Sequence, residues 1–256
     1  MLNKMKAKMR TGEPVFGGAG GWWYPEVAEV LDEIGLDFVV FDMQHGSVSY
    51  ETIQRYIQKV DQTKTTVIGR AASSATVDVS KILDVGALGV IIPDVDTRDE
   101  TIHVLNAAKY PPFGTRSIDH LMAPAEAKEL NENVVVIPMI ETLAGLANIN
   151  DIVSLEGVDG IYIGPNDLSC SLGIFTEWRN TRFLEAIEKV AEACKRRTVY
   201  CGIMAPIQPP EKPIDIGCRI YSVGTAASFM RTGGMQALQH AKDAVLRRTT
   251  ETGRTA

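Results

Sequence analysis

The sequence predicts an α/β fold of one domain, a single (β/α)8 TIM barrel spanning residues 1–256. Three observations lead to this prediction. Short apolar runs recur along the chain, segments with helical periodicity separate them, and no shift to a Gly- or Pro-rich composition marks a linker. A chain of 256 residues that is 45% hydrophobic can also form the large core that one barrel needs.

Strands are expected where apolar runs are continuous, because the parallel strands of a barrel are covered on both faces and do not alternate with polar residues. Eight such runs occur, at residues 15–18, 37–42, 66–70, 87–92, 134–140, 159–164, 198–203 and 219–224. Their number matches the strand count of a TIM barrel.

Helices are expected between these runs, where apolar residues recur three and four positions apart. The segments 27–34, 53–60 and 183–191 show this spacing clearly. Gly35 and Gly86 each follow a helical segment, as is typical of a helix C-cap. Repetition of strand then helix is the pattern that favours a barrel over other α/β folds.

One long irregular connection, residues 110–125, interrupts this alternation. Its prolines exclude a regular helix, and a loop of this length on a barrel is often functional. His120 lies within it, so we expect this histidine to be a candidate for lining the barrel mouth.

Composition excludes several classes of protein. The net charge of −6 gives no indication of a nucleic-acid surface, and no apolar run approaches the length of a membrane span. The four cysteines lack Cys-x-x-Cys spacing, which predicts free thiols in a reducing cytoplasm. Basic residues cluster at the start, where we expect a solvated turn and not a signal peptide: Lys4, Lys6, Lys8 and Arg10.

Polar residues follow the expected strands at the end where a barrel carries its chemistry. They are Asp42, Gln44, His45, Arg70, Asp94, Glu141, Asn166 and Asp167. Glu141 and Asp167 follow two neighbouring strands, and paired carboxylates suit a divalent cation such as Mg²⁺. An acid complementing a helix dipole and an Asx-type cap are the alternatives for these two residues.

The chain closely resembles the HpcH/HpaI family of class II, metal-dependent pyruvate aldolases over residues from about 15 to 235. Six motifs carry the resemblance: DMQHG (42–46), GR (69–70), KILDVGALGVIIP (81–93), YPPFGTRS (110–117), PMIET (138–142) and EGVDGIYIGPNDLSCSLG (156–173). It implies reversible aldol cleavage of 4-hydroxy-2-oxo acids to pyruvate, or a related 2-oxo acid, and an aldehyde. It also implies a homohexamer in which neighbouring subunits exchange the last helix.

The resemblance assigns roles to individual residues. Glu141 and Asp167 match the ligands of a divalent cation, which would be Mg²⁺, Mn²⁺ or Co²⁺. His45 matches the catalytic base, and Asp84 matches the carboxylate that pairs with this histidine. Arg70 matches the arginine that contacts the pyruvate oxygens and stabilises the enolate, whereas the residue type alone also fits a structural salt bridge.

Substrate-binding positions follow from the same resemblance. The stretch 163–169 is expected to hold the substrate carboxylate through backbone N–H groups, which places Pro165, Asn166 and Asp167 in the pocket. Trp23 follows the first strand and is expected to form a wall of the pocket, with ordinary packing as the alternative.

Three residues depart from the family pattern, and together they indicate an altered substrate range. Met139 stands where many relatives have glutamine, and Gln44 stands where glutamate is frequent. Ala226 occupies a position that is often acidic and that would lie near the aldehyde. None of the three removes a predicted metal ligand.

Three rival functions remain open. A Schiff-base aldolase needs a lysine at the mouth, and none follows an expected strand. An acyl-CoA lyase of the citrate-lyase β type needs a basic surface for the CoA phosphates, and no such cluster lies near these loops. A non-catalytic oligomer that binds a 2-oxo acid is the third rival. In each case the expected partners are small molecules, not nucleic acid or membrane.

Overall fold

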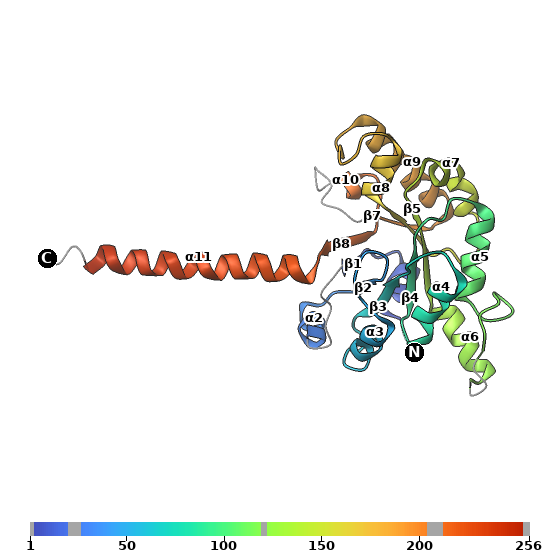
Figure 1. Ribbon diagram of the computed structural model, residues 1–256, viewed down its shortest axis with the longest axis horizontal. Helices are drawn as coiled ribbons and strands as arrows, with labels where there is room; N and C mark the ends of the chain where they lie inside the picture. The colour runs from blue at the N-terminus through green and yellow to red at the C-terminus, as the bar shows by residue number, and fades with distance from the viewer. Residues whose placement is uncertain (1–2, 20–26, 119–121, 204–211, 253–256) are drawn as a thin grey trace.

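The computed structural model describes residues 3–19, 27–118, 122–203 and 212–252. Eight parallel strands form a closed barrel in chain order (Figure 1). They are β1 (Val15–Ala19), β2 (Phe38–Asp42), β3 (Thr66–Arg70), β4 (Gly89–Ile92), β5 (Val135–Ile140), β6 (Gly160–Ile163), β7 (Tyr200–Ile203) and β8 (Ile220–Gly224). All eight predicted strands are confirmed, and the single barrel is the fold that the sequence predicted.

Most helices of the described chain surround this barrel (Figure 1). They are α1 (Lys4–Thr11), α2 (Ala28–Ile34), α3 (Tyr50–Ile57), α4 (Thr76–Asp84), α5 (Arg98–Ala108), α6 (Pro124–Asn133), α7 (Leu143–Ile152), α8 (Pro165–Ser171), α9 (Thr181–Arg197), α10 (Lys212–Asp215) and α11 (Ala226–Thr252). Gly35 and Gly86 have φ values of 82° and 101°, which confirms the predicted left-handed ends of two helices.

Two apolar layers form because successive side chains of a strand point to opposite faces. On β2, Phe38 and Val40 pack inside the barrel, while Val39 and Phe41 pack against the helices. Asp42 is the next inward position on this strand. The same alternation makes the residues at the C-terminal ends of other strands point into the mouth of the barrel.

Helix α1 closes the N-terminal end of the barrel. Met5 is fully buried and belongs to the barrel-interior cluster, and Met9, four residues later, packs against the same cluster. Asn3 caps the helix through a hydrogen bond from the backbone N–H of Lys6. One face of this short helix therefore serves as the floor of the barrel.

The lysines of α1 are held by acids at the starts of strands. Lys4 and Lys8 form ion pairs with Asp37 at 3.0 and 2.8 Å, and Lys6 pairs with Asp159. These two aspartates directly precede β2 and β6. The expectation of a solvated turn is therefore wrong for these lysines, because packing of the methionines brings their charges against the rim of the barrel.

The long connection joins α5 to α6 at the N-terminal end of the barrel. Its start is fixed by Asn131, whose side chain bonds both the N–H and the carbonyl of Tyr110. Farther along, Arg116 contacts Asp84, just before β4. The described part of this loop thus lies away from the mouth, and His120 falls outside the described residues.

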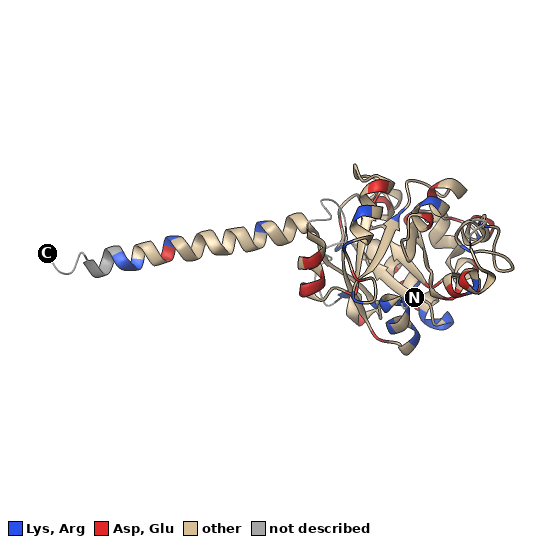
Figure 2. Cartoon of the chain, turned by 90° about the horizontal axis from the view of Figure 1, so that it is seen from below, with Lys and Arg blue, Asp and Glu red and all other residues tan. Residues whose placement is uncertain are grey.

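Helix α11 projects away from the barrel (Figure 1). Its exposed apolar residues include Met230, Met235, Leu238, Val245 and Leu246. No Lys, Arg, Asp or Glu occurs between Arg231 and Lys242, so much of its length is free of charge (Figure 2). In the described part of the chain, no helix is long and apolar enough to span a membrane.

Candidate active site

A cavity of about 380 Å³ opens at the C-terminal end of the barrel. Segments following β2, β4, β5 and β6 supply its lining, which consists of Gln44, His45, Asp94, Glu141, Thr142, Asp167, Cys170 and Ser171. The predicted metal ligands and the predicted base therefore lie around one cavity. This is the end of a TIM barrel at which catalytic groups are found.

Glu141 is the most buried acid of this cavity, with 3% of its surface exposed. It follows Met139 in the inward phase of β5, so the strand itself aims its side chain into the barrel. Gly164 makes room for it, because a Cβ at that position would lie 2.5 Å from Glu141 Oε2. The glycine of the IGPND motif is thus needed for the carboxylate to enter.

Charge around Glu141 is unbalanced. Burial, together with the negative charges of Asp94 and Asp167, raises the pKa of Glu141 to about 7, although the hydrogen bond from the Asp94 N–H and the charge of Arg70 lower it in part. No lysine or arginine forms an ion pair with any of these three acids within the described chain. Two further negative charges near a buried carboxylate are therefore unfavourable unless a cation offsets them.

Asp94 holds Glu141 through the backbone. Its N–H donates a hydrogen bond of 2.9 Å to Glu141 Oε1. The residue has a φ of 53°, a left-handed conformation that costs on the order of 1 kcal/mol for a residue other than glycine. Aspartate tolerates this conformation better than most residues. The sequence placed Asp94 at a strand end but gave no signal for this backbone contact.

The third acid, Asp167, lies in the first turn of α8. Pro165 begins this helix and is buried, whereas Asn166 and Asp167 are exposed. The first backbone N–H groups of a helix have no partner within it, so the N–H groups here are available to an anion. The predicted substrate-binding positions and the predicted metal ligand therefore share one helix start.

These residues fit a divalent cation. No group of three or more His, Cys, Asp or Glu side chains has the arrangement of a metal site among the described residues. With Glu141 and Asp167 as two protein ligands, several positions of an octahedral ion would remain for substrate and water. Oxygen ligands alone suit Mg²⁺, Mn²⁺ and related ions.

Arg70 lies beside the cavity in a buried ion pair with Asp42. Its Nε donates to Asp42 Oδ1 at 2.9 Å, and its Nη2 contacts Asp42 Oδ2. The two residues are direct partners in the β2–β3 register, a neighbour relation that the sequence could have indicated once the barrel was assumed. The structural salt bridge, left open for Arg70 by the sequence, is therefore formed.

Asp42 also orders the loop that carries the predicted base. Its Oδ1 accepts hydrogen bonds from the N–H groups of Gln44 and His45 at 3.0 and 3.2 Å. Burial raises the pKa of Asp42, but hydrogen bonds and charge from Arg70, together with these amides, bring it below its usual value. One ionised carboxylate thus fixes both the arginine and the start of the histidine loop.

The predicted pairing of His45 with Asp84 does not form within one chain. Asp84 bonds Arg116 at 2.8 and 3.2 Å and lies 3.7 Å from Lys81. It ends α4, before β4 begins, whereas His45 follows the far end of β2. A helix that returns antiparallel to the strands necessarily places these residues at opposite ends of the barrel.

The three departures from the family pattern have distinct surroundings. Met139 is buried inside the barrel near Gly164. Gln44 lines the cavity, and its buried Oε1 has no hydrogen-bond partner within the described structure. Ala226 is buried at the first turn of α11. Trp23, the predicted pocket wall, lies outside the described residues.

Comparison with known proteins agrees with this geometry. The profile of the HpcH/HpaI aldolase/citrate lyase family matches residues 23–231. A hydroxypyruvate/pyruvate aldolase from Delftia acidovorans is 30% identical over 242 residues, which cover 91% of this chain and 90% of that protein. A 5-keto-4-deoxy-D-glucarate aldolase from Escherichia fergusonii is 28% identical over 239 residues, covering 90% of this chain and 93% of that protein.

A solved structure shows the same architecture. The crystal structure of an HpcH/HpaI aldolase/citrate lyase family protein from Burkholderia cenocepacia J2315 matches with a TM-score of 0.86 and 25% identity. The match covers 94% of this chain and 100% of that one. From the profile match and these relatives, we conclude that the chain belongs to the HpcH/HpaI aldolase/citrate lyase family.

Proposed function

We propose that this protein is a class II, metal-dependent aldolase that reversibly cleaves 4-hydroxy-2-oxo acids into pyruvate, or a related 2-oxo acid, and an aldehyde. Membership of its family makes it a carbon–carbon lyase. The observation that carries the metal-dependent part is buried Glu141, flanked by Asp94 and Asp167 without a cationic partner among the described residues. Its similarity to a hydroxypyruvate/pyruvate aldolase supports a 2-oxo acid as one product.

In this proposal Glu141 and Asp167 hold Mg²⁺, Mn²⁺ or Co²⁺. The cation would supply a Lewis acid that polarises the keto group of the substrate. Asp94 keeps Glu141 Oε1 in place through its N–H, and Gly164 leaves the space that this carboxylate occupies.

The substrate would be oriented by backbone and arginine. N–H groups at Asn166 and Asp167, at the start of α8, would bind its carboxylate, next to buried Pro165. Arg70 would stabilise negative charge on the keto oxygen as the carbon–carbon bond breaks. Asp42 holds the plane of that guanidinium, which reduces the reorganisation needed during the reaction.

His45 would carry the proton. In the cleavage direction it accepts the proton of the C4 hydroxyl, and in the addition direction it removes a proton from C3 of the 2-oxo acid. A neutral imidazole suits both steps near pH 7. Its position on the lining of the cavity, in a loop held by Asp42, supports this role.

We further propose a homohexamer in which α11 packs on a neighbouring subunit. The exposed apolar side chains of this helix support the proposal, as do Phe16 and Val223, which are exposed on β1 and β8. A single chain keeps His45 and Asp84 at opposite ends, so these residues would meet only between two copies. Sedimentation analysis tests the assembly, with Leu238→Asp on α11 expected to weaken it.

Complementation tests the meeting of His45 and Asp84. We expect His45→Ala and Asp84→Asn proteins to be inactive alone. Mixed after mild dissociation and reassociation, they should regain activity, since some interfaces then combine an intact histidine with an intact aspartate. No recovery in oligomers shown to be mixed contradicts the shared site and leaves the metal proposal standing.

Two rival chemistries are separable by experiment. No lysine or arginine lines the described part of the 380 Å³ cavity, which disfavours both a Schiff base and a CoA phosphate subsite. A chelator should abolish activity, whereas borohydride with pyruvate should not. Cleavage of malyl- or citramalyl-CoA would instead support the citrate-lyase β type.

Four free cysteines fit a reducing compartment, and we place the enzyme in the cytoplasm.

The decisive experiment is a retro-aldol screen of 4-hydroxy-2-oxo acids with metal-free enzyme. Pyruvate release would be followed with and without Mg²⁺, Mn²⁺ or Co²⁺. We expect turnover only with metal and its loss in both Glu141→Gln and Asp167→Asn. Equal turnover in the presence of a chelator contradicts the proposal, as does 2-oxo-acid binding without turnover across an aldehyde panel.

A further inference from the structure

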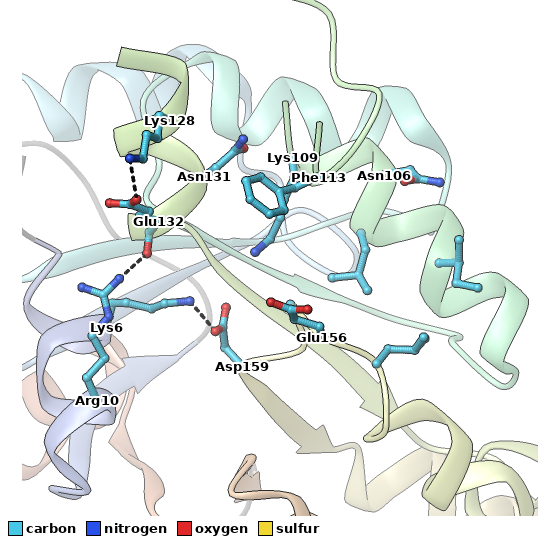
Figure 3. Close-up of a pocket in the computed structure, with 14 residues that line it drawn as sticks. Lys6, Arg10, Asn106, Lys109, Phe113, Lys128, Asn131, Glu132, Glu156 and Asp159 are labelled. Carbon is cyan, nitrogen blue, oxygen red and sulfur yellow. Dashed lines mark hydrogen bonds and ion pairs between the residues drawn. The ribbon is translucent and has the colours of Figure 1, made fainter. Parts of the chain in front are cut away.

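A second cavity, of about 560 Å³, lies at the opposite end of the barrel (Figure 3). It opens between α1, α5, α6, the loop that follows α5 and the turn that precedes β6. Its volume falls within the range of small-molecule sites in proteins, about 300–1,000 Å³. None of the residues assigned to the aldol reaction lines it, so the proposed function leaves this cavity unexplained.

The lining carries one more positive than negative charge. Its ionisable residues are basic Lys6, Arg10, Lys109 and Lys128 and acidic Glu132, Glu156 and Asp159. The whole chain has a net charge of −6, so the excess is a local feature. Local positive potential of this kind attracts anions.

Three of the four basic side chains are already engaged. Lys6 pairs with Asp159, Lys128 lies 4.0 Å from a Glu132 carboxylate oxygen, and Arg10 donates to the Glu132 carbonyl at 2.7 Å. These contacts, drawn in Figure 3, hold the walls of the cavity together. They leave one ammonium group that forms no hydrogen bond or ion pair within the part of the chain that the structure describes.

That group belongs to Lys109, at the C-terminal end of α5. Its half-buried side chain makes no hydrogen bond or ion pair with the described residues, and Figure 3 shows it reaching into the cavity. Burial lowers the pKa of Lys109, and the nearby charges of Asp159 and Glu156 only partly oppose this. A partly desolvated ammonium without a partner is stabilised by an anion.

An apolar wall adjoins this ammonium. Phe113 is 61% exposed although it is a large aromatic residue, and it lines the same cavity as Lys109 (Figure 3). Leu105, Leu155 and Ile102 extend the apolar surface on the same cavity. A charged group next to an apolar wall is the usual composition of a site for an amphipathic small molecule.

We propose that this cavity binds a small organic anion, with its carboxylate or phosphate at Lys109 and its apolar or aromatic part against Phe113. Lys109 supplies the charged contact, while Arg10 and Lys128 add positive potential at the rim. The site is separate from the aldol cavity, so its occupancy and metal-dependent turnover are independent measurements.

Calorimetric titration of the full-length protein with four probes tests the chemistry. Phenyl phosphate and phenylacetate carry the two candidate anions on an aromatic ring, and benzyl alcohol and benzylamine are the neutral and cationic controls. We expect saturable binding of at least one anion at millimolar concentration or below, and none of either control. The stronger of the two anions identifies the preferred head group.

Variants locate the binding. Lys109→Met keeps the aliphatic stem and should weaken anion binding about tenfold or more, whereas Lys109→Arg should retain it. Lys59→Met, which removes an exposed lysine in the turn after α3, is the matched control and should bind as the unmodified protein does. Unchanged melting temperatures show that the variants fold.

A second change separates the two halves of the site. Phe113→Ala should weaken binding of phenyl phosphate but not of inorganic phosphate, since only the former uses the apolar wall. The inference is overturned if no anion binds, if Lys109→Met and Lys59→Met have equal effects, or if benzyl alcohol binds as well as phenylacetate. If the protein binds the anion at Lys109 but shows no metal-dependent aldol turnover, only the proposed aldolase function is contradicted.

Discussion

The buried acids at the two ends of the barrel differ in whether basic side chains neutralise them. At the N-terminal end, Asp37 lies between Lys4 and Lys8 of α1. Burial raises the pKa of Asp37, but these lysines and the N–H of Phe16 bring it below its usual value. At the C-terminal end, Glu141 has no such partner among the described residues, and burial raises its pKa to about 7.

The difference separates stability from function. An acid that is ionised and paired in the folded chain stabilises that chain, as Asp37 does where α1 closes the barrel floor. An acid that is buried without a partner destabilises it, and such a group persists where a ligand supplies the missing charge. The unneutralised end is therefore the one at which a cation is expected.

Glu141→Gln gives the largest expected effect. Removing the buried carboxylate should lower metal-dependent retro-aldol turnover by roughly 10³-fold, because the cation loses a charged ligand. The isosteric amide should leave the melting temperature of the metal-free protein unchanged or higher, as an unpaired buried charge is removed. Steady-state assays and thermal melts measure both. A destabilised variant would show that Glu141 belongs with Asp37 as a structural acid.

Arg70→Lys tests a residue that combines features of both ends. Arg70 is ion-paired, as Asp37 is, yet it lies near the candidate active site, as Glu141 does. A lysine keeps the charge but loses the two-point contact with Asp42, so we expect kcat to fall by about 10²-fold. The KM for the 2-oxo acid should change less than kcat if Arg70 acts on charge formed during the reaction. Arg219→Lys, which changes an exposed arginine just before β8 at the other end of the barrel, is the matched control. Equal kcat values for Arg70→Lys and the unmodified enzyme would remove Arg70 from the mechanism.

Asp37→Asn should produce the converse of Glu141→Gln. Two lysines lose a buried counter-charge, and we expect the free energy of unfolding to fall by about 2 kcal/mol at pH 7, the partial exposure of both lysines being allowed for. Turnover per folded enzyme should stay within about twofold, since the change is at the far end of the barrel. Urea unfolding and active-site-normalised assays provide the two numbers. A large loss of turnover without loss of stability would show that Asp37 acts in catalysis and is not a structural acid.

The pH dependence gives the smallest effect and has opposite sign at the two ends. Glu141 binds its proton more tightly in the folded chain, so its contribution to the metal-free fold is complete below its usual pKa of 4.5 and is lost as pH rises through about 7. Asp37 contributes above its usual pKa of 3.8, and this is lost as pH falls through its lowered value.

Urea unfolding of the chelator-treated protein across this range separates the two contributions. Glu141→Gln should flatten the change near neutral pH, and Asp37→Asn should flatten the acid limb. Metal affinity should rise with pH through 7, by less than about tenfold per unit, because binding displaces the Glu141 proton. Affinity independent of pH over this interval contradicts the raised pKa.

Much of the fold was readable from the sequence because strand and helix periods are local properties. The runs at 66–70 and 134–140 match β3 and β5 to within one residue. The sequence also predicted the end of the barrel at which the site lies, because the strands of a barrel are parallel and their last residues share one rim. Glu141 and Asp167 on one cavity were predicted on that basis alone.

Contacts between segments that are distant in the chain could not be predicted from the sequence. Nothing local indicates that the lysines of α1 meet Asp37 and Asp159, or that the long connection lies at the barrel floor. Asp84 and His45 do not pair within one chain, because a motif match carries a role without saying at which end of the barrel, or in which copy of the chain, the residue meets its partner.

The sequence by itself determined the barrel, the strand ends that carry acids, and the family to which the chain is similar. Each of these depends on the order and spacing of residues along one chain. Only the tertiary structure decided which acids are neutralised, that Arg70 is bound by Asp42, and that Lys109 enters a separate cavity. Charge pairing and burial depend on distance in space, which the closed barrel sets by bringing remote segments to a common rim.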